Sequence, residues 1–479
     1  MTNKGCIMNK KIFGGLLITS MLLISGCTST KTTDVNILAT TDLHGVLPNE
    51  LSEYVANEKK KDKNITLVDA GDFCDSEFGV SGDMEKFFEQ TGKDRLENNI
   101  QYRDMPLAKE MKDIGYDTVT LGNHEFLGSK KELDNMITSF EKQGVSVLSA
   151  NTYKSNGESY TKPYVIKEVE TPEGTVKLGI LGLTIKEVGE SKYWDGEKLV
   201  ENKSLELKDQ AGFKGELYMT DLVEDAKKWV KVMKEKDKAD VIVAVAHTGE
   251  KPKKPRHPGN RIQDLATQVD GIDAIVAGHN HVQIKQNDYK NKSGEKVIVT
   301  EPGKHGECIS KINLKLEKDG DKWEVIDKSS DIVQFEKSKK ALNEMCNNIG
   351  IFGSVLFDKK DNLGEEISFG KTMKFKWNKL YVFSPKTPRE KIYNTVGYKF
   401  LNIAESNEPQ LVFMNGNEVV LYMSGEERCA PYSFDFKKSD FNDGVLTIRS
   451  DKNDCFRMEE GEENTYTNSP TIKFVYTSK

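Results

Sequence analysis

The chain has 479 residues, which is long for a single hydrophobic core, so we expect two domains. Its hydrophobic content of 37% and charged content of 30% are typical of a soluble globular protein. The formal net charge of −7 argues against a nucleic-acid-binding face, because that average charge repels a long polyanion.

The N-terminus has the pattern of a secretory signal. Lys10-Lys11 precedes an apolar run over 12–24 that is short for a membrane span. The run ends in Leu23-Ile24-Ser25-Gly26-Cys27, which resembles a bacterial lipobox. This resemblance implies a lipoprotein signal peptide over 1–26, an acylated Cys27 and a polar tether over 27–33. The chain would then be held by lipid on the extracytoplasmic face of the cell membrane. Ordinary secretion and a retained anchor are the alternatives.

The next segment, from 34 to about 300, alternates strand-like and helix-like patterns, which predicts an α/β domain. The expected strands are 35–39, 65–68, 118–121, 145–148, 241–245, 274–276 and 297–299. The expected helices are 105–114, 131–142 and 222–234. Two hairpins predict a second, partly antiparallel sheet: 164–169 with 176–181, and 312–316 with 323–326. Residues 76–101 and 188–214 are polar without strong periodicity and are expected to be long loops, either at the mouth of a site or without such a role.

Composition changes near Phe335, and residues 347–479 contain short strands, many aromatic residues and no histidine. Thr387-Pro388-Arg389-Glu390 has the form of a capping box that opens a helix reaching about Phe400. Asn415-Gly416-Asn417 predicts a hairpin between 411–414 and 419–422. We therefore expect a first domain over 34–335 and a β-rich α+β domain of unknown role over 345–479, with a linker near Ser338-Lys339-Lys340.

Five of the seven histidines lie in four short segments that each follow a predicted strand: Asp42-Leu43-His44-Gly45, Gly122-Asn123-His124-Glu125, Ala246-His247-Thr248-Gly249 and Gly278-His279-Asn280-His281. A fifth segment, Gly71-Asp72, lies between the first two. In extended backbone, residues i and i+2 project to the same face, so the side chains of Asp42 and His44 can reach one cation. His279 and His281 have the same i, i+2 spacing. The candidate ligands are Asp42, His44, Asp72, Asn123, His247, His279 and His281.

Carboxylate and imidazole ligands without thiolate favour manganese, zinc or iron over calcium. Two such divalent ions about 3.5–4 Å apart would polarise phosphoryl oxygens and deprotonate a bridging water for in-line attack on phosphorus. His124 could stabilise the developing charge or protonate the leaving group. Each segment alone is more often a turn, a helix cap or a core histidine, but their shared position after apolar strands favours a metal site. His257 and His305 lack this setting and are interpreted as surface or loop residues.

These segments, with Asp69-Ala70-Gly71-Asp72, resemble the calcineurin-like metallophosphoesterases, and most closely the bacterial 5′-nucleotidase and UDP-sugar hydrolase branch. The resemblance covers about residues 34–333 and implies a four-layer αββα sandwich with a dinuclear centre. It assigns one metal to Asp42, His44, Asp72 and His281. It assigns the other to Asp72, Asn123, His247 and His279, with His124 as the catalytic histidine.

Two departures from the family bear on the substrate. The nucleotidases have an aspartate that pairs with the catalytic histidine, where this chain has Leu127; related cyclic-nucleotide phosphodiesterases also lack that aspartate. The nucleotide pocket of the nucleotidase C-terminal domain is not found after Phe335. We expect hydrolysis of nucleotides or related small phosphoesters. A 2′,3′-cyclic phosphodiesterase, another ester hydrolase on the same site, and a surface binding lipoprotein on this scaffold are the alternatives.

A disulfide between Cys429 and Cys455 is a further possibility.

Overall fold

The computed structural model describes residues 31–74, 83–189, 192–194, 199–201, 204–213, 215–251, 259–359, 362–398, 400, 403, 406–424, 432–464 and 469–478. The expected signal peptide with Cys27, the disulfide partner Cys429, and His257 lie outside these residues, so the predictions that rest on them stay predictions. Within the described ranges, no helix combines the length and the apolar character needed to cross a bilayer.

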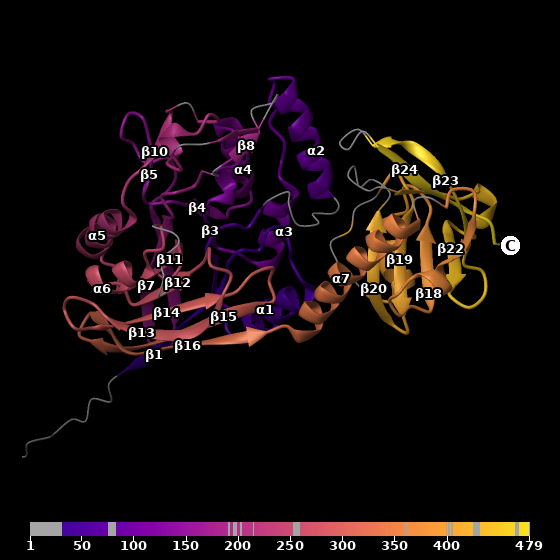
Figure 1. Ribbon diagram of the computed structural model, residues 1–479. Coiled ribbons are helices and arrows are strands. Elements are labelled where there is room, and N and C mark those ends of the chain that lie inside the picture. Colours follow the sequence, from indigo (N-terminus) through magenta and orange to yellow (C-terminus); the bar gives the residue numbers. More distant parts are fainter. Residues whose placement is uncertain are drawn as a thin grey trace, which may run out of the picture.

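The first domain contains two mixed six-stranded sheets (Figure 1). The first sheet has the order β16-β15-β1-β2-β3-β4, in which β1 to β4 pair in parallel and β15 pairs antiparallel with both β1 and β16. Its strands are β1 (Thr32–Thr40), β2 (Thr66–Asp69), β3 (Thr118–Thr120), β4 (Ser146–Leu148), β15 (Cys308–Asp319) and β16 (Lys322–Gln334). Its outer face is covered by helices α1 (Asn49–Lys61), α3 (Pro106–Ile114) and α4 (Lys130–Lys142).

The second sheet has the order β13-β14-β12-β11-β7-β6, with a parallel centre and an antiparallel strand at each edge. Its strands are β6 (Tyr164–Thr171), β7 (Gly174–Thr184), β11 (Val241–His247), β12 (Ala274–Ala277), β13 (Gln283–Lys290) and β14 (Lys296–Pro302). Helices α5 (Leu222–Val232), continued by a π-helical turn (Met233–Asp237), and α6 (Ile262–Gln268) cover its outer face. Short elements complete the domain: β5 (Thr152–Lys154) with β10 (Leu217–Met219), β8 (Lys192–Trp194) with β9 (Leu199–Glu201), and 3₁₀ turns at His124–Phe126 and Leu207–Asp209.

Alternation along β1 explains how the layers are joined. Val35, Ile37 and Ala39 are buried in the apolar core that lies between the two sheets, whereas Leu38 belongs to the core under the helices. Successive strand residues point to opposite faces, so one strand contributes to both cores. The prediction of a four-layer αββα sandwich is confirmed, and both predicted hairpins form. They do not share one second sheet as expected, because β15–β16 extends the first sheet and β6–β7 forms an edge of the second.

The C-terminal domain lies beside the sandwich at the far end of a long helix (Figure 1). It has two four-stranded sheets around an aromatic-rich core, in the orders β17-β23-β24-β21 and β20-β19-β18-β22. Its elements are α7 (Glu336–Lys359), β17 (Glu366–Ser368), α8 (Phe369–Thr372), β18 (Lys379–Phe383), α9 (Arg389–Val396), β19 (Gln410–Asn415), β20 (Glu418–Ser424), β21 (Tyr432–Asp435), a 3₁₀ turn (Lys438–Asp440), β22 (Val445–Arg449), β23 (Cys455–Asn464) and β24 (Ser469–Tyr476). The predicted strand-rich α+β character and the hairpin at Asn415-Gly416-Asn417 are confirmed.

Three local predictions are wrong. Residues 83–96 form helix α2 rather than a loop, because Met84, Phe87 and Phe88 give it an apolar stripe against the helix-layer core. The expected linker at 338–340 is part of the continuous helix α7, which buries Met345 and Phe352 one heptad apart.

The helix expected to extend to Phe400 is α9, which ends at Val396, where Gly397 adopts a φ of 102°. Among the residues that the structure describes, no side chain caps the start of α9. The Thr387 hydroxyl donates to Ser384 O at 2.7 Å instead of accepting a hydrogen bond from the first turn of the helix.

Candidate metal centre

The candidate ligands lie where parallel strands of both sheets end. Asp42 and His44 follow β1, Asp72 follows β2, and Asn123 follows β3. In the second sheet His247 is the last residue of β11, and His279 and His281 follow β12. The carboxyl ends of these strands meet at one edge of the sandwich, and the side chains are brought together there from positions up to 239 residues apart in the sequence, which runs from Asp42 to His281.

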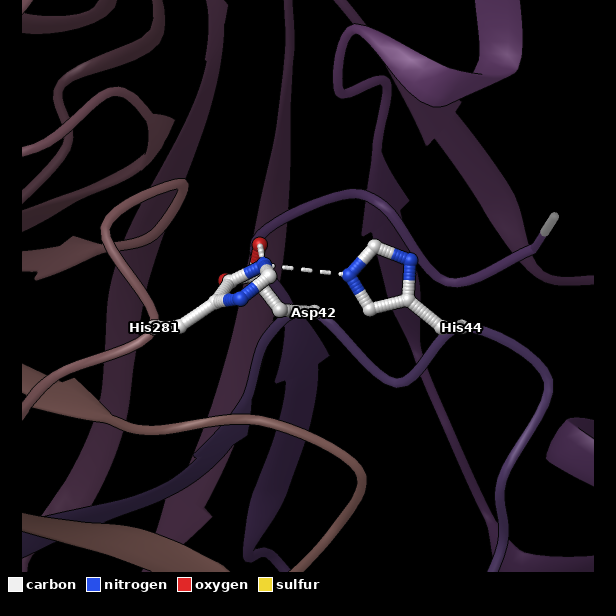
Figure 2. Close-up of side chains that lie close together, drawn as sticks. All are labelled: Asp42, His44 and His281. Atoms are coloured by element: carbon white, nitrogen blue, oxygen red, sulfur yellow. Dashed lines mark hydrogen bonds and ion pairs between the residues drawn. The ribbon is translucent and has the colours of Figure 1, made fainter. Parts of the chain in front are cut away.

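The first donor group consists of Asp42, His44 and His281, whose ligand atoms lie within 4.8 Å of one another. The two ring nitrogens, His44 Nε2 and His281 Nε2, face each other at 3.1 Å, as Figure 2 shows. His281 Nε2 also lies 3.3 Å from Asp42 Oδ1. Asp42 and His44 are fully buried, whereas the His281 side chain is 33% exposed, so the group is open on one side only.

The second donor group consists of Asp72, His247 and His279, again with ligand atoms within 4.8 Å of one another. The Asn123 amide oxygen lies 3.1 Å from His247 Nε2 and 2.9 Å from His279 Nδ1. Asp72 Oδ2 lies 3.1 Å from the same His247 nitrogen. The opposite His247 nitrogen, Nδ1, lies 2.9 Å from Ala70 O, which directs Nε2 toward the group.

Five of these ligands adopt backbone conformations that are rare for residues with a side chain. The φ angles are positive at Asp42 (50°), His44 (48°), Asp72 (53°), His279 (74°) and His281 (58°). Such conformations cost on the order of 1–3 kcal/mol each and persist only where the surroundings impose them. Here the first two motifs impose them on each other: Asp42 N–H donates to Gly71 O and His44 N–H donates to Asp72 O, both at 2.9 Å.

Two glycines let the motif backbones approach closely. Gly71 has a φ of 99°, and a Cβ there would lie 2.7 Å from Gly122 N and 2.8 Å from His247 Nδ1. A Cβ at Gly122 would overlap both the carboxylate and the backbone nitrogen of Asp72. Glycine is therefore required at both positions for Asp72 to lie between the two sheets.

Two buried carboxyl groups support the site without belonging to either donor group. Glu125 accepts backbone N–H groups from Gly122 (2.6 Å), Asp72 (3.0 Å) and Cys74 (3.2 Å), which ties the Gly-Asn-His-Glu segment to the Gly-Asp segment. Asp69 accepts the Thr40 hydroxyl (2.7 Å) and the Gly71 N–H (2.9 Å). Burial raises the pKa of both carboxyl groups to about 8. Glu125 and Asp69 both lie in motifs that can be recognised in the sequence, but the spacing of apolar and polar residues did not indicate a role for either carboxyl group.

In the second donor group, the pairing of His247 with Asp72 shifts the pKa values of both side chains. Burial acts to lower the pKa of His247, but the Asp72 carboxylate outweighs it and raises that pKa to about 10. Burial likewise acts to raise the pKa of Asp72, and the His247 ring with the His124 N–H brings it below its ordinary value. Without a cation the two side chains therefore form an ion pair, and a bound cation would take the place of the His247 proton.

His124 lies at the border of the two groups. Its backbone N–H donates to Asp72 Oδ1 at 2.8 Å, and its ring packs edge-on against His44 with centroids 4.9 Å apart. The side chain is 20% exposed, so it can reach a molecule bound at the open side. Leu127, in place of the family aspartate, is 40% exposed.

His305 was interpreted as a surface or loop residue. The loop assignment holds, since His305 lies in a turn after β14, but the ring packs against His44 with centroids 5.6 Å apart. Its backbone N–H donates to Asp42 O at 2.8 Å. Burial, with His44 next in effect, lowers the pKa of His305 to about 4. Tertiary packing brings His305 to the site; the segment Glu301-Pro302-Gly303-Lys304-His305-Gly306, which also resembles the family, was the sequence signal that could have indicated this.

The donor sets fit divalent cations. Each combines buried carboxylate oxygen with imidazole nitrogen, the second adds an amide oxygen, and neither contains a thiolate. The fold and these two neighbouring sites define the class of the protein: a two-sheet α/β sandwich with paired candidate metal sites at one edge.

Comparison with known proteins places the chain in a family. The calcineurin-like phosphoesterase model matches residues 35–283, more than half of the chain, so the protein belongs to the calcineurin-like phosphoesterase family. The chain is 29% identical over 344 residues to the trifunctional nucleotide phosphoesterase protein YfkN of Bacillus subtilis, a match that covers 66% of this chain and 22% of that protein.

Two further comparisons agree. The chain is 25% identical over 333 residues to a 2′,3′-cyclic-nucleotide 2′-phosphodiesterase/3′-nucleotidase of Salmonella typhimurium, covering 63% of this chain and 46% of that protein. A crystal structure of calcineurin-like phosphoesterase YfkN from Bacillus subtilis, 27% identical, superposes with a TM-score of 0.50 over 64% of this chain and 91% of that one. The chain spans less than half the length of these two curated relatives.

Proposed function

We propose that this protein hydrolyses phosphoesters with two divalent metal ions bound at the paired donor groups. The observation that carries the proposal is the adjacency of the two groups. His279 and His281 enter different groups from a single turn, and His124 and Asp72 connect the groups on the other side. A phosphate ester bound at this edge would meet both groups at once.

Asp42, His44 and His281 would hold one ion, and Asn123, His247 and His279 the other, with Asp72 between them. When bound, the two ions supply the positive charge that polarises a phosphoryl group and activates water. The chain's own residues fix the ligand directions: Ala70 O orients His247, and the N–H of His279 donates to both Asp42 oxygens, at 3.2 and 3.0 Å.

His124 is the residue we assign to the leaving group. It is partly exposed beside both donor groups, and its main-chain N–H is held by the Asp72 carboxylate. A histidine at this position can donate a proton to the departing oxygen or stabilise its charge. Leu127, three residues later, offers no carboxylate to this histidine.

We propose nucleotides or related small phosphoesters as substrates. The support is the similarity to proteins named as nucleotide phosphoesterases, which the chain matches over about two thirds of its own length. A 2′,3′-cyclic phosphodiesterase is the second candidate, favoured by Leu127 and by the similarity to a protein of that name. We also propose that Cys27 is lipidated and that the enzyme acts outside the cytoplasmic membrane; the lipobox-like sequence supports this.

The test is metal-dependent hydrolysis by the purified chain. The panel contains AMP, UDP-glucose, 2′,3′-cyclic AMP and bis-p-nitrophenyl phosphate, with manganese or zinc added after chelation. We expect turnover that requires metal and that falls at least about 100-fold in Asp72→Ala and Asn123→Ala. Gly92→Ala is the matched control, because nothing lies within 4 Å of a Cβ added at this helical position. Turnover that survives Asp72→Ala contradicts the site assignment. Two bound ions without turnover on this panel favour another ester as the substrate, whereas a protein that binds no metal favours the binding lipoprotein.

A further inference from the structure

The turn at 278–281 links the two donor groups. It carries His279 into the second group and His281 into the first, and both residues have positive φ angles of 74° and 58°. The distance between the two donor groups therefore depends on the conformation of this one turn and on the contacts that hold it in place. Its middle residue, Asn280, is not a member of either group.

The Asn280 side chain binds the segment that follows β11. Its Nδ2 donates to Glu250 O at 3.0 Å, and its Oδ1 accepts from Asn260 Nδ2 at 3.0 Å. Asn260 also donates to Glu250 O at 3.3 Å, so the two amides and one carbonyl form a closed triangle. Glu250 and Asn260 are only three and thirteen residues beyond His247, so the triangle ties the turn to the strand that supplies a second-group ligand.

Glu250 is itself fixed to the neighbouring strand. Its carboxylate accepts from Asn287 Nδ2 at 3.0 and 3.1 Å and from Tyr289 OH at 2.5 Å, and both donors lie on β13. The carbonyl that receives Asn280 is therefore part of a rigid frame. The Asn280 amide also lies directly against Gly249, where a Cβ would overlap it.

The opposite side of the turn rests on the first motif. The N–H of His279 donates to both carboxylate oxygens of Asp42, and a Cβ at Gly278 would overlap the Thr41 hydroxyl oxygen. The turn is thus held between Asp42 on one side and the Glu250–Asn260 frame on the other. The second attachment is made by the Asn280 side chain, which binds no metal in our assignment. The first attachment is made through the backbone of His279.

We propose that Asn280 is a positioning residue that sets the separation of the two metal ions by locking the His279–His281 turn to Glu250 and Asn260. This inference rests on the proposed function, since it presumes that both groups bind metal. The site needs a donor and an acceptor in one planar group of this length, which asparagine supplies. Aspartate has the same size but lacks the donor for Glu250 O. The variant Asn280→Asp therefore removes this hydrogen bond without changing the side-chain volume.

The experiment compares the wild-type chain with Asn280→Ala, Asn280→Asp and the control Asn135→Ala in helix α4, which removes a side-chain hydrogen bond to Gln101 O and touches neither the turn nor the Glu250–Asn260 frame. Each is chelated, loaded with Mn²⁺ and measured for bound manganese, for the exchange-coupled EPR signal of a manganese pair, and for kcat and KM. Thermal midpoints in EDTA report on folding.

We expect wild type and Asn135→Ala to bind two manganese ions with a coupled spectrum. In Asn280→Ala and Asn280→Asp we expect the coupled signal to be lost or reduced and the second ion to bind about 10-fold or more weakly. We expect kcat to fall about 10–100-fold with KM within about 3-fold, and the midpoint in EDTA to change by only a few degrees. A coupled spectrum and kcat unchanged in both Asn280 variants overturn the proposal.

If Asn280→Ala lowers the yield of folded protein, Asn260→Ala provides the second variant, because it removes one hydrogen bond to Asn280 and leaves the turn sequence intact. It should weaken the coupled signal in the same direction, and an unchanged signal overturns the proposal. If wild type itself fails to bind a manganese pair, the proposed function fails with it. If wild type binds the pair and the variants match it, only the role of Asn280 fails.

Discussion

His44 and His281 bring their Nε2 atoms to 3.1 Å from one another across the boundary between the two sheets. Two imidazole nitrogens at this distance must share a proton or a cation, because two bare lone pairs would repel. The Asp42 carboxylate beside them favours positive charge at this point. This contact is the closest approach between the two histidines of the first donor group, and it marks the point where a cation would bind.

Removing one of these rings should empty one site and spare the other. We expect His281→Ala to lower bound manganese from two ions to one per chain and to lower hydrolysis at least about 100-fold, since His281 belongs to the first donor group and not to the second. Metal analysis after dialysis provides the measurement. His305→Ala is the control: it removes a ring that also packs against His44 but is not in either donor group. Two tightly bound ions in His281→Ala would contradict the assignment.

The close approach of the motif backbones should make Gly122 intolerant of a side chain. A Cβ there would overlap the carboxylate and the backbone nitrogen of Asp72, and the backbone cannot yield as a flexible side chain can. We expect Gly122→Ala to lower the free energy of unfolding by about 2 kcal/mol or more and to weaken metal binding. Gly92→Ala, in helix α2 with open space around it, should leave stability unchanged or raise it by up to about 1 kcal/mol. Equal denaturation midpoints for the two variants would refute this expectation.

Buried Asp69 should make the metal-free protein less stable as pH rises. Burial raises its folded pKa from 3.8 to about 8, so between these values the folded protein holds a proton that the unfolded chain has released. The free energy of unfolding should therefore fall between about pH 4 and pH 8, with up to about 1.4 kcal/mol per pH unit due to this proton. Asp69→Asn keeps the shape of the side chain and cannot titrate. Urea denaturation in EDTA should show a shallower pH slope for this variant, and parallel slopes would exclude Asp69 as the titrating group.

Leu127 gives a test of how His124 is tuned. The Leu127 side chain is 40% exposed three residues after His124, in the same 3₁₀ turn region, so a carboxylate there can approach the imidazole. We expect Leu127→Asp to stabilise the charged imidazole and to shift the basic limb of the kcat/KM profile upward in pH, because His124 must be protonated to act on the leaving group. Leu127→Asn, which has similar size and no charge, should leave that limb in place. A shift of the same size in both variants would show that polarity or volume, and not charge, is responsible.

The sequence determined much of this protein because its signals are local. Apolar β-branched runs define β1, β2, β11 and β12, and a ligand that follows a parallel strand must lie at the carboxyl edge of a sheet. The i, i+2 spacing of Asp42 with His44 and of His279 with His281 therefore pointed to a metal site before any contact was known. The amphipathic stripe of α2 was missed because polar residues surround its sparse apolar positions. The start of α7 was missed because its first residues, 336–340, are almost all charged and have no apolar periodicity.

The family resemblance implied how the ligands divide between two metals, and only the tertiary structure decided which contacts produce that division and support the ligands. His279 and His281 are two residues apart yet belong to different groups, because both hold left-handed backbone conformations that turn their rings in different directions. The roles of Glu125, Asn280 and His305 depend on contacts between segments far apart in sequence, made by side chains that no periodic pattern distinguishes. Residue type and spacing identify the ligands and the chemistry that they can support. The geometry of the site depends instead on tertiary packing between strands, and the order of those strands in the sheets cannot be read from the sequence.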